Sequence, residues 1–331
     1  MKFVGMVLAL FLSTVSSSYR VHAQDPDWSK VAFEPMETTD RFGRKIRFYL
    51  SREKATGEMP VVLWIQGSGC QSLFNSRNGQ IFGSYQNILL SVSLGRVRIL
   101  AVEKPGVEPL SEAVRPGSAE GATESFCEEH TLPRWAEANA AALKAVWDMP
   151  GVNKQKTLLI GHSEGAIVAA RIAAELPSVT HIACMAGGGP NQLFDLEATQ
   201  RTPRPGDQPG DADARVDSIR EGWLKVQKDP ESTKAMWLGH PHRRWTSFLS
   251  TSLIDEINRS KAMVYVVQGD RDQNSSILSF DIARERLEGK REGAFFHRVL
   301  EGDHAFQTPN STSPIEGMET QFKQTLDWFL K

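Results

Sequence analysis

The sequence predicts an α/β protein in which helices cover both faces of a mainly parallel β-sheet. Short apolar runs of strand length alternate along the chain with longer segments whose apolar residues recur at helical spacing. Several of the apolar runs end in glycine-rich turns, and open α/β sheets bind ligands at that end of their strands. In the stretch 157–170, a turn that begins and ends with glycine joins an apolar run directly to an alanine-rich helix.

Hydrophobic patterns predict the individual elements. Ile46, Phe48 and Leu50 alternate with their neighbours, which is typical of a half-buried strand. Apolar runs, typical of strands buried on both faces, occupy residues 61–65, 97–102 (broken by Arg98), 157–160, 181–186 and 263–267, and a further strand is predicted at 295–300. Segments of helical period occupy residues 132–147, 166–176, 276–287 and 321–330.

Residues 190–260 interrupt this alternation. Within them, residues 201–211 are too rich in proline, glycine and charge to form a core element. Two apolar stripes of helical spacing follow: Val216, Ile219, Trp223 and Val226, then Trp245, Phe248, Leu249 and Leu253. For each of these side chains, packing against the rest of the protein is favoured over a role in substrate binding.

Composition and charge exclude some classes of protein. The 331 residues are 40% hydrophobic and 24% charged, which is enough apolar material for a large globular core. The formal net charge of −2 gives no electrostatic reason to expect nucleic acid or an anionic membrane surface as a partner.

The N-terminal residues predict export. Lys2 precedes an apolar segment at 3–15 that is too short to span a bilayer comfortably. Val21 and Ala23 place small residues at the −3 and −1 positions of a cleavage site, so residues 1–23 are predicted to be a signal peptide. We therefore expect a secreted or periplasmic protein with no stable membrane span after cleavage. The alternative is an uncut membrane anchor.

The turn at residues 161–165 predicts an exposed serine. Gly161 and Gly165 remove the Cβ atoms that would collide where strand and helix approach each other. Ser163 is then left at the apex of the turn, above the N-terminus of the following helix. Gly161-His162-Ser163-Glu164-Gly165, in this strand–turn–helix context, resembles the nucleophile elbow of the α/β-hydrolase superfamily.

The resemblance extends over nearly the whole chain after residue 23. It implies an α/β-hydrolase fold with a core domain made of residues 24–189 and 261–331. Residues 190–260 resemble the helical cap that this superfamily commonly inserts after the sixth strand. No metal or organic cofactor is implied.

The superfamily order of nucleophile, acid and histidine selects the remaining catalytic candidates. His304 follows the last predicted strand and is the candidate base that a serine nucleophile requires. Asp272 follows the strand before it and is the candidate acid that orients the histidine. Asp270 is interpreted as a turn residue, and Asp195 is the alternative acid.

The resemblance also implies an oxyanion hole. The backbone N–H of Glu164 is one expected donor, and that of Ser68 is the other, with Gly69 second. Gln66 stands where the family pattern usually has histidine, a change that leaves a backbone donor unaffected. The Glu164 side chain is interpreted either as an exposed carboxylate at a helix N-terminus or as a group that binds a cationic substrate.

Cysteine and histidine residues allow further hypotheses. Cys70 and Cys127 lie in predicted loops on the face of the turn, so a Cys70–Cys127 disulfide is the preferred pairing, with three unpaired thiols as the alternative. Cys184 is predicted to be a buried thiol. His240 and His242 suggest a metal site only weakly, because no third ligand has a suitable spacing.

The resemblance implies an exported serine hydrolase that cleaves a carboxylic ester of a small-molecule acyl substrate. Peptide or amide hydrolysis and acyl transfer are alternatives within the same fold. A binding module without turnover is the alternative of a different class. The sequence identifies neither the acyl group nor the oligomeric state.

Overall fold

An eight-stranded sheet organises the part of the chain that the computed structural model describes, residues 27–52 and 57–331. Strands β1 and β2 are antiparallel, β2 runs antiparallel to β6, and the remaining neighbours are parallel. In sheet order the strands are β1 (Phe33–Thr39), β2 (Lys45–Ser51), β6 (Arg98–Val102), β3 (Met59–Ile65), β7 (Val152–His162), β8 (His181–Met185), β11 (Met263–Gly269) and β12 (Ala294–Val299).

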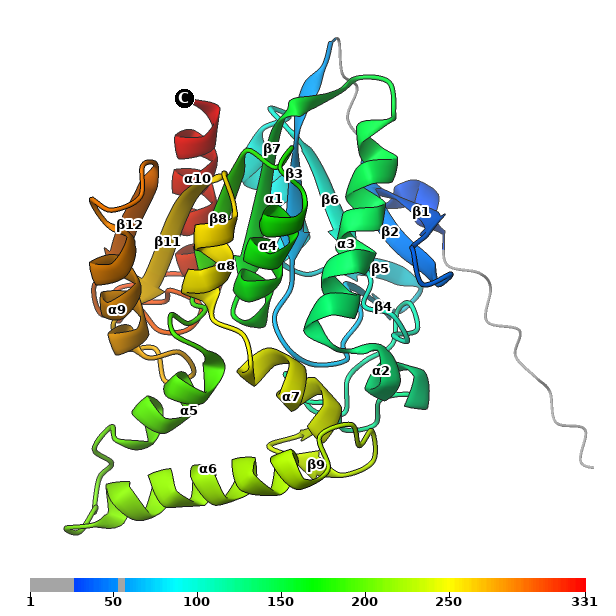
Figure 1. Cartoon of the computed structure of the whole chain (residues 1–331). Helices are drawn as coiled ribbons and strands as arrows, with labels where there is room; N and C mark the ends of the chain where they lie inside the picture. The colour runs from blue at the N-terminus through cyan, green and yellow to red at the C-terminus, as the bar shows by residue number, and fades with distance from the viewer. Residues whose placement is uncertain (1–26, 53–56) are drawn as a thin grey trace, which may run out of the picture.

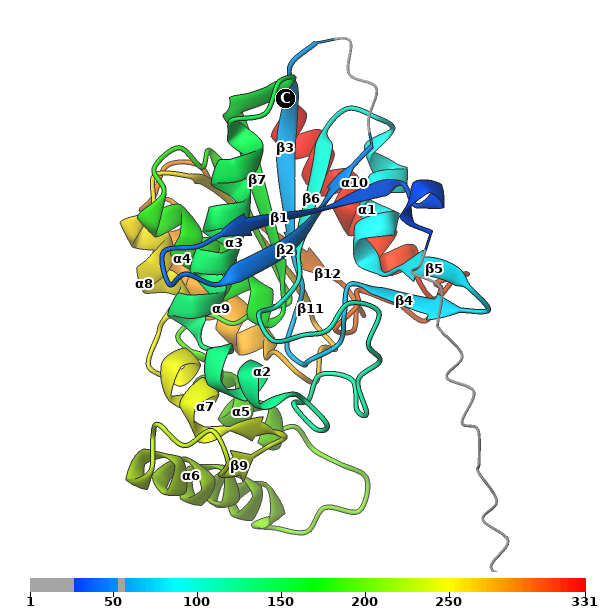
Figure 2. The same cartoon turned by 90° about the vertical axis from the view of Figure 1, so that its right-hand side faces the viewer.

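Helices cover both faces of this sheet (Figure 1; Figure 2). One face carries α1 (Tyr85–Ser93) and α10 (Glu316–Leu330), and the other carries α3 (Leu132–Trp147), α4 (Glu164–Glu175), α8 (Leu253–Arg259) and α9 (Ile277–Leu287). Alternate residues of the apolar run in β3 enter opposite layers: Leu63 belongs to the cluster with α3 and α4, and Trp64 to the cluster with α1 and α10. The mainly parallel, two-sided α/β architecture predicted from the sequence is confirmed.

The segment between β8 and β11 lies largely beyond one end of the sheet. It contains α5 (Gln192–Gln200), α6 (Asp211–Lys228), the short pair β9 (Met236–Trp237) and β10 (His240–Pro241), and α7 (His242–Leu249). Figures 1 and 2 both show α6 away from the sheet, next to α5 and α7. Helix α8 falls in the range predicted for the insertion but packs against α4, and its Leu253, Ile254 and Ile257 join the main apolar cluster.

Several elements have no counterpart in the sequence-based prediction. Strand β1 contains Pro35, which interrupts a strand pattern because it lacks an N–H donor. The structure places β1 at the edge of the sheet. No strand pairs with its outer side, so a missing N–H donor on that side costs no hydrogen bond between strands. The hairpin β4 (Phe74–Arg77) and β5 (Gln80–Gly83), the helices α1 and α2 (Glu124–Glu129) and the 3₁₀ turn Trp28–Lys30 were likewise not predicted.

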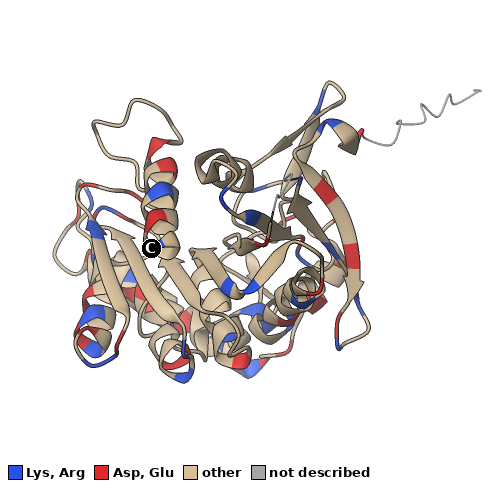
Figure 3. Ribbon diagram, turned by 90° about the horizontal axis from the view of Figure 1, so that it is seen from above, with Lys and Arg blue, Asp and Glu red and all other residues tan. Residues whose placement is uncertain are grey.

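Acidic and basic residues are interspersed along the outer helices and strands in Figure 3. Within residues 27–52 and 57–331, no helix combines the length and apolar character that a membrane crossing needs. The predicted signal peptide, residues 1–23, lies outside the described residues.

The backbone is packed very closely where β7 turns into α4. A Cβ atom added to Gly161 would lie 2.0 Å from the carbonyl oxygen of Gly165. A Cβ atom added to Gly165 would lie 2.2 Å from the carbonyl oxygen of Ile65 in β3. Both contacts are with backbone atoms that cannot rotate away, so only glycine fits at these positions.

Replacement of Gly165 by alanine is expected to destabilise the protein by about 3 kcal/mol or more, because the new methyl group overlaps the β3 backbone. Urea unfolding of the purified variant measures the loss. Gly57→Ala is the matched control, since a Cβ there meets no heavy atom within 4 Å. Equal stability of the two variants would contradict the close packing described.

Candidate active site

Ser163 occupies the strained turn between β7 and α4. Its φ of 56° and ψ of −121° are unusual for a residue with a side chain, and such conformations persist where the surroundings enforce them. Its N–H donates to the carbonyl oxygen of Met185 at 2.8 Å, and its own carbonyl oxygen accepts from Ala166 at 3.0 Å. These two hydrogen bonds and the flanking glycines hold Ser163 at the apex, as the sequence predicted.

His304 is hydrogen-bonded to Asp272, the acid that the sequence favoured. The His304 Nδ1 donates to Asp272 Oδ2 at 2.8 Å, so Nε2 is the ring nitrogen that Asp272 does not engage. Oδ1 of Asp272 accepts from the backbone N–H groups of Asn274 and Ser275, at 2.7 and 3.0 Å. Burial tends to raise the pKa of Asp272, but the hydrogen bonds from His304, Asn274 and Ser275 outweigh it and hold that pKa below its ordinary value.

The other two acids considered have different partners. Oδ1 of Asp195 accepts from Ser276 N–H and from Ser279 Oγ, at 2.8 and 2.6 Å. Burial, against these hydrogen bonds, raises the pKa of Asp195 to about 7. Asp270 accepts the backbone N–H of Glu301 at 2.6 Å, which is the turn role expected for it.

His162 packs beneath the turn and supports His304. Its ring lies 4.8 Å from the His304 ring, centroid to centroid, and its Nε2 donates to the His304 carbonyl oxygen at 2.8 Å. Burial lowers the pKa of His162 to about 3, so the ring is neutral at ordinary pH.

The loop after β3 lies directly against Ser163. A Cβ on Gly67 would be 3.2 Å from the Ser163 Cβ. Lys104 Nζ holds this loop from behind, because it donates to the carbonyl oxygens of Gly67 at 2.5 Å and Gly69 at 2.8 Å. In a trans peptide the C=O and the following N–H point in opposite directions, so a Gly67 carbonyl turned toward Lys104 turns the Ser68 N–H away from it. Within the described residues, this N–H has no acceptor.

The Glu164 side chain differs from both sequence-based interpretations. It is fully buried and not exposed, and its carboxylate is bound by internal cations and not left free for a substrate cation. Arg244 donates to Oε2 through Nε and Nη2, at 3.0 and 2.5 Å. His130 Nε2 lies 2.9 Å from Oε1, and Lys104 Nζ lies 3.7 Å from it. Despite burial, these partners hold the pKa of Glu164 well below its ordinary value.

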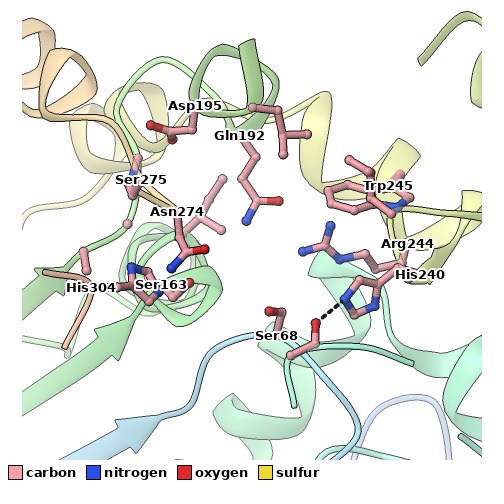
Figure 4. Close-up of a pocket in the computed structure, with 18 of the residues that line it drawn as sticks. Ser68, Ser163, Gln192, Asp195, His240, Arg244, Trp245, Asn274, Ser275 and His304 are labelled. Atoms are coloured by element: carbon pink, nitrogen blue, oxygen red, sulfur yellow. Dashed lines mark hydrogen bonds between the residues drawn. The ribbon is translucent and has the colours of Figure 1, made fainter. Parts of the chain in front are cut away.

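Ser163 and His304 lie at the wall of a cavity of about 770 Å³. Ser163, His304 and Ser68 line it from turns that follow strands of the eight-stranded sheet, and Arg244 and Trp245 line it from α7 (Figure 4). Of the predicted site residues, Ser68, Ser163 and His304 line this cavity, as does Asp195, whereas Asp272 and Glu164 do not. A volume of this size accommodates a small organic ligand.

The predicted Cys70–Cys127 disulfide is wrong for this structure, in which Cys70, Cys127 and Cys184 are free thiols. Cys70 and Cys127 nevertheless pack into one small apolar cluster. Cys184 is buried as predicted, and burial raises its pKa to about 12. The histidines of the weak metal hypothesis bind backbone carbonyls, His240 that of Gly117 at 2.8 Å and His242 that of Asp229 at 3.1 Å.

Sequence reasoning did not identify Lys104, His130 or Arg244. Lys104 carried a detectable signal, because it follows a buried strand directly at the ligand-binding edge of the sheet. His130 and Arg244 carried none. They reach Glu164 only through contacts between segments that are far apart in the chain.

A family model described as "Putative esterase" matches residues 39–308. The chain belongs to this family. No curated protein matches the chain by sequence.

Solved structures share the fold at low identity. Est1E from Butyrivibrio proteoclasticus with bound ferulic acid is 14% identical, with a TM-score of 0.57 over 89% of this chain and 99% of that one. Acetyl xylan esterase 1 from Thermoanaerobacterium is 14% identical, with a TM-score of 0.54 over 89% and 83%. A puromycin-hydrolysing peptidase of Mycobacterium tuberculosis is 12% identical, with a TM-score of 0.57 over 90% and 39%. The protein is a hydrolase of the α/β-hydrolase superfamily.

The buried histidines predict how stability depends on pH. Burial lowers the pKa of His130 to about 4 and those of His162 and His240 to about 3, below the ordinary value of 6.5. Below about pH 6.5 the unfolded chain therefore binds protons that the folded protein does not, and stability is lost. The free energy of unfolding should fall by up to about 2 kcal/mol per histidine between about pH 6.5 and pH 5.

Urea unfolding at several pH values measures this fall. His240→Gln keeps an N–H donor for the Gly117 carbonyl oxygen but removes the titrating group, so its stability should fall less steeply over the same range. The carboxylates of Glu164 and Asp272, whose pKa values are lowered, lose their contribution only at lower pH, below their ordinary values of 4.5 and 3.8. An unchanged slope in His240→Gln would contradict a neutral buried His240.

Proposed function

We propose that the protein is an exported serine hydrolase that cleaves carboxylic esters through an acyl-enzyme intermediate. The observation that carries the proposal is the hydrogen bond from His304 to Asp272 at the cavity that Ser163 also lines. Membership of the esterase family supports an ester as the bond cleaved. Export rests on the N-terminal sequence alone.

In the proposed reaction, Asp272 fixes the Nδ1–H tautomer of His304, so that Nε2 accepts the Ser163 hydroxyl proton. The Ser163 oxygen bonds to the acyl carbon, and the resulting oxyanion is stabilised by the N–H groups of Ser68 and Glu164. His304 then protonates the departing alcohol. Water, activated by His304 in turn, releases the acid and restores the serine.

Lys104 orients one half of the proposed oxyanion hole. Its two hydrogen bonds fix the Gly67–Gly69 loop, and the planar peptide transmits that orientation to the Ser68 N–H. Burial lowers the pKa of Lys104 to about 8, although the Glu164 carboxylate opposes this shift. The ammonium is therefore lost as the pH rises through about 8.

Two alternatives remain within the proposal. Peptide or amide hydrolysis uses the same groups, and the fold neighbour named as a puromycin-hydrolysing peptidase favours testing it. Acyl transfer would follow if an acceptor other than water entered the cavity. A binding module without turnover is disfavoured, because such a module has no need of a histidine oriented by Asp272 beside Ser163.

A fluorophosphonate probe tests the nucleophile directly. The protein without residues 1–23 should gain a single adduct in intact mass, and Ser163→Ala should gain none, because only an activated serine hydroxyl reacts. p-Nitrophenyl esters of increasing chain length, compared with aminoacyl p-nitroanilides, then separate esterase from peptidase activity. Absence of an adduct on folded protein would favour the binding module.

The acid is tested by two aspartate variants. Asp272→Asn should lower kcat about 10⁴-fold, because the wrong histidine tautomer is then favoured. Asp195→Asn removes the alternative acid, which has no contact with His304, and should change kcat less than tenfold, roughly, on the same ester. The reverse order of effects would assign the role to Asp195.

The role of Lys104 is tested by the pH dependence of kcat. Lys104→Met should lower kcat by roughly 10- to 100-fold, as expected for a weakened oxyanion-hole donor. The wild type should lose activity as the pH rises through about 8, the pKa of Lys104. Lys104→Arg keeps its charge at alkaline pH, so the loss should move to higher pH. An alkaline limb at the same pH in Lys104→Arg would exclude Lys104 as its origin.

A further inference from the structure

The buried charges next to the cavity do not balance within the protein. Two cations, Arg244 and Lys104, face one carboxylate, that of Glu164. His130 adds no charge at neutral pH, because burial lowers its pKa to about 4. Glu103, the neighbour of Lys104 in the chain, accepts hydrogen bonds from the Ser72 hydroxyl and the Leu73 N–H, and burial raises its pKa to about 7 although Lys104 opposes this shift, so it balances Lys104 only in part. Among Arg244, Lys104 and Glu164, the positive charge therefore exceeds the negative charge.

Arg244 is the cation with an unused donor. Its Nε and Nη2 both bind Glu164 Oε2, but its Nη1 has no hydrogen-bond partner within the described residues, although that atom is buried. A buried guanidinium N–H that lacks an acceptor costs more free energy than a buried neutral donor that lacks one. This is the state expected of a group whose acceptor is a ligand.

The Arg244 guanidinium is held in a fixed position beside the cavity. Its central carbon lies 3.9 Å from the centroid of the Trp245 ring and 4.7 Å from that of Phe248. It lines the same cavity as Ser163 and points toward its interior in Figure 4. A preorganised guanidinium with a free N–H binds an anionic oxygen with little loss of side-chain freedom.

The remaining charged groups of the cavity also favour an anion. Of the described residues that line the cavity, Arg115 and Arg244 are basic and Asp195 is the one acid. Asp195 is engaged by Ser276 and Ser279, and burial raises its pKa to about 7, so it is partly neutral at ordinary pH. A single negative charge on the ligand would balance the excess positive charge beside Arg244.

We propose that Arg244 binds a free carboxylate on the substrate, so that the preferred substrates are esters that carry one carboxylate group. This inference rests on the proposed function, since it names the substrate class of the same site. The carboxylate belongs either to the acyl part, as in a monoester of a dicarboxylic acid, or to the alcohol part, as in an acylated hydroxybenzoate.

Matched ester pairs test the proposal and distinguish the two positions. Monoethyl glutarate is compared with ethyl glutaramate for the acyl side, and 4-acetoxybenzoate with 4-acetoxybenzamide for the alcohol side. Each pair differs only in a carboxylate against a neutral amide. For at least one pair, kcat/KM should be about 10- to 100-fold higher for the carboxylate, the range of a buried charge-assisted hydrogen bond. Ratios near one for both pairs would overturn the proposal.

Two neighbouring arginine variants locate the effect. Arg244→Met removes the main partner of buried Glu164, so activity on both esters should fall, but the carboxylate-to-amide ratio, which does not depend on the fraction of active protein, should come close to one. Arg243→Met is the matched control on the same helix, because Arg243 faces Glu231, at 3.6 Å, and does not line the cavity. It should keep the wild-type ratio. A preference that survives in Arg244→Met would assign the anion to another group.

Binding measured without turnover separates this proposal from the proposed function. Calorimetry with Ser163→Ala should show the same preference for 4-acetoxybenzoate over 4-acetoxybenzamide, or for monoethyl glutarate over ethyl glutaramate. If the fluorophosphonate probe does not label the wild type but this preference is present, the serine mechanism fails and the carboxylate site stands. Labelling without any preference, in binding or in turnover, would refute the carboxylate site and leave the serine mechanism intact.

Discussion

The close approach of three backbone segments at Ser163 is the constraint on which the site depends. The β7–α4 turn packs against the end of β3 so tightly that Gly161 and Gly165 admit no Cβ. This contact fixes the position of Ser163 relative to β3 and the point at which α4 begins. It also fixes how far Ser163 lies from the loop that contains Ser68. His304 is then held beside the same turn through His162. This steric condition and the His162 hydrogen bond together position groups from three parts of the chain.

Local sequence patterns predicted most strands of the sheet, because the central strands are mainly apolar runs that need no long-range information. Helix α3 was predicted with the bounds that the structure gives it, since its apolar residues share one face. Strand β1 was missed because Pro35 is tolerated only at an edge, and edge position is a property of the assembled sheet. The predicted disulfide was wrong because loops on the same face need not bring two sulfurs into bonding geometry.

The candidate site was predictable only in part, for a related reason. Ser163, Asp272 and His304 each follow a strand, so the order of the elements indicated them. The electrostatic surroundings of Glu164 were not predictable. The sequence indicated an exposed or substrate-binding carboxylate, whereas the side chain is buried against cations of the protein itself. A glutamate at a helix N-terminus is usually solvated, but here α7 covers it and supplies Arg244. Partners that meet only in three dimensions leave no spacing pattern in the sequence.

The ion pair between Glu164 and Arg244 links α4 to the segment between β8 and β11. Glu164 begins the helix behind Ser163, whereas Arg244 belongs to α7, so this buried ion pair joins two segments of the chain. Exchange of the segment between β8 and β11 for that of another hydrolase would leave a fully buried carboxylate with its main partner missing. Chimeric proteins built on this fold must therefore carry residues 164 and 244 as one unit, although 79 residues separate them along the chain.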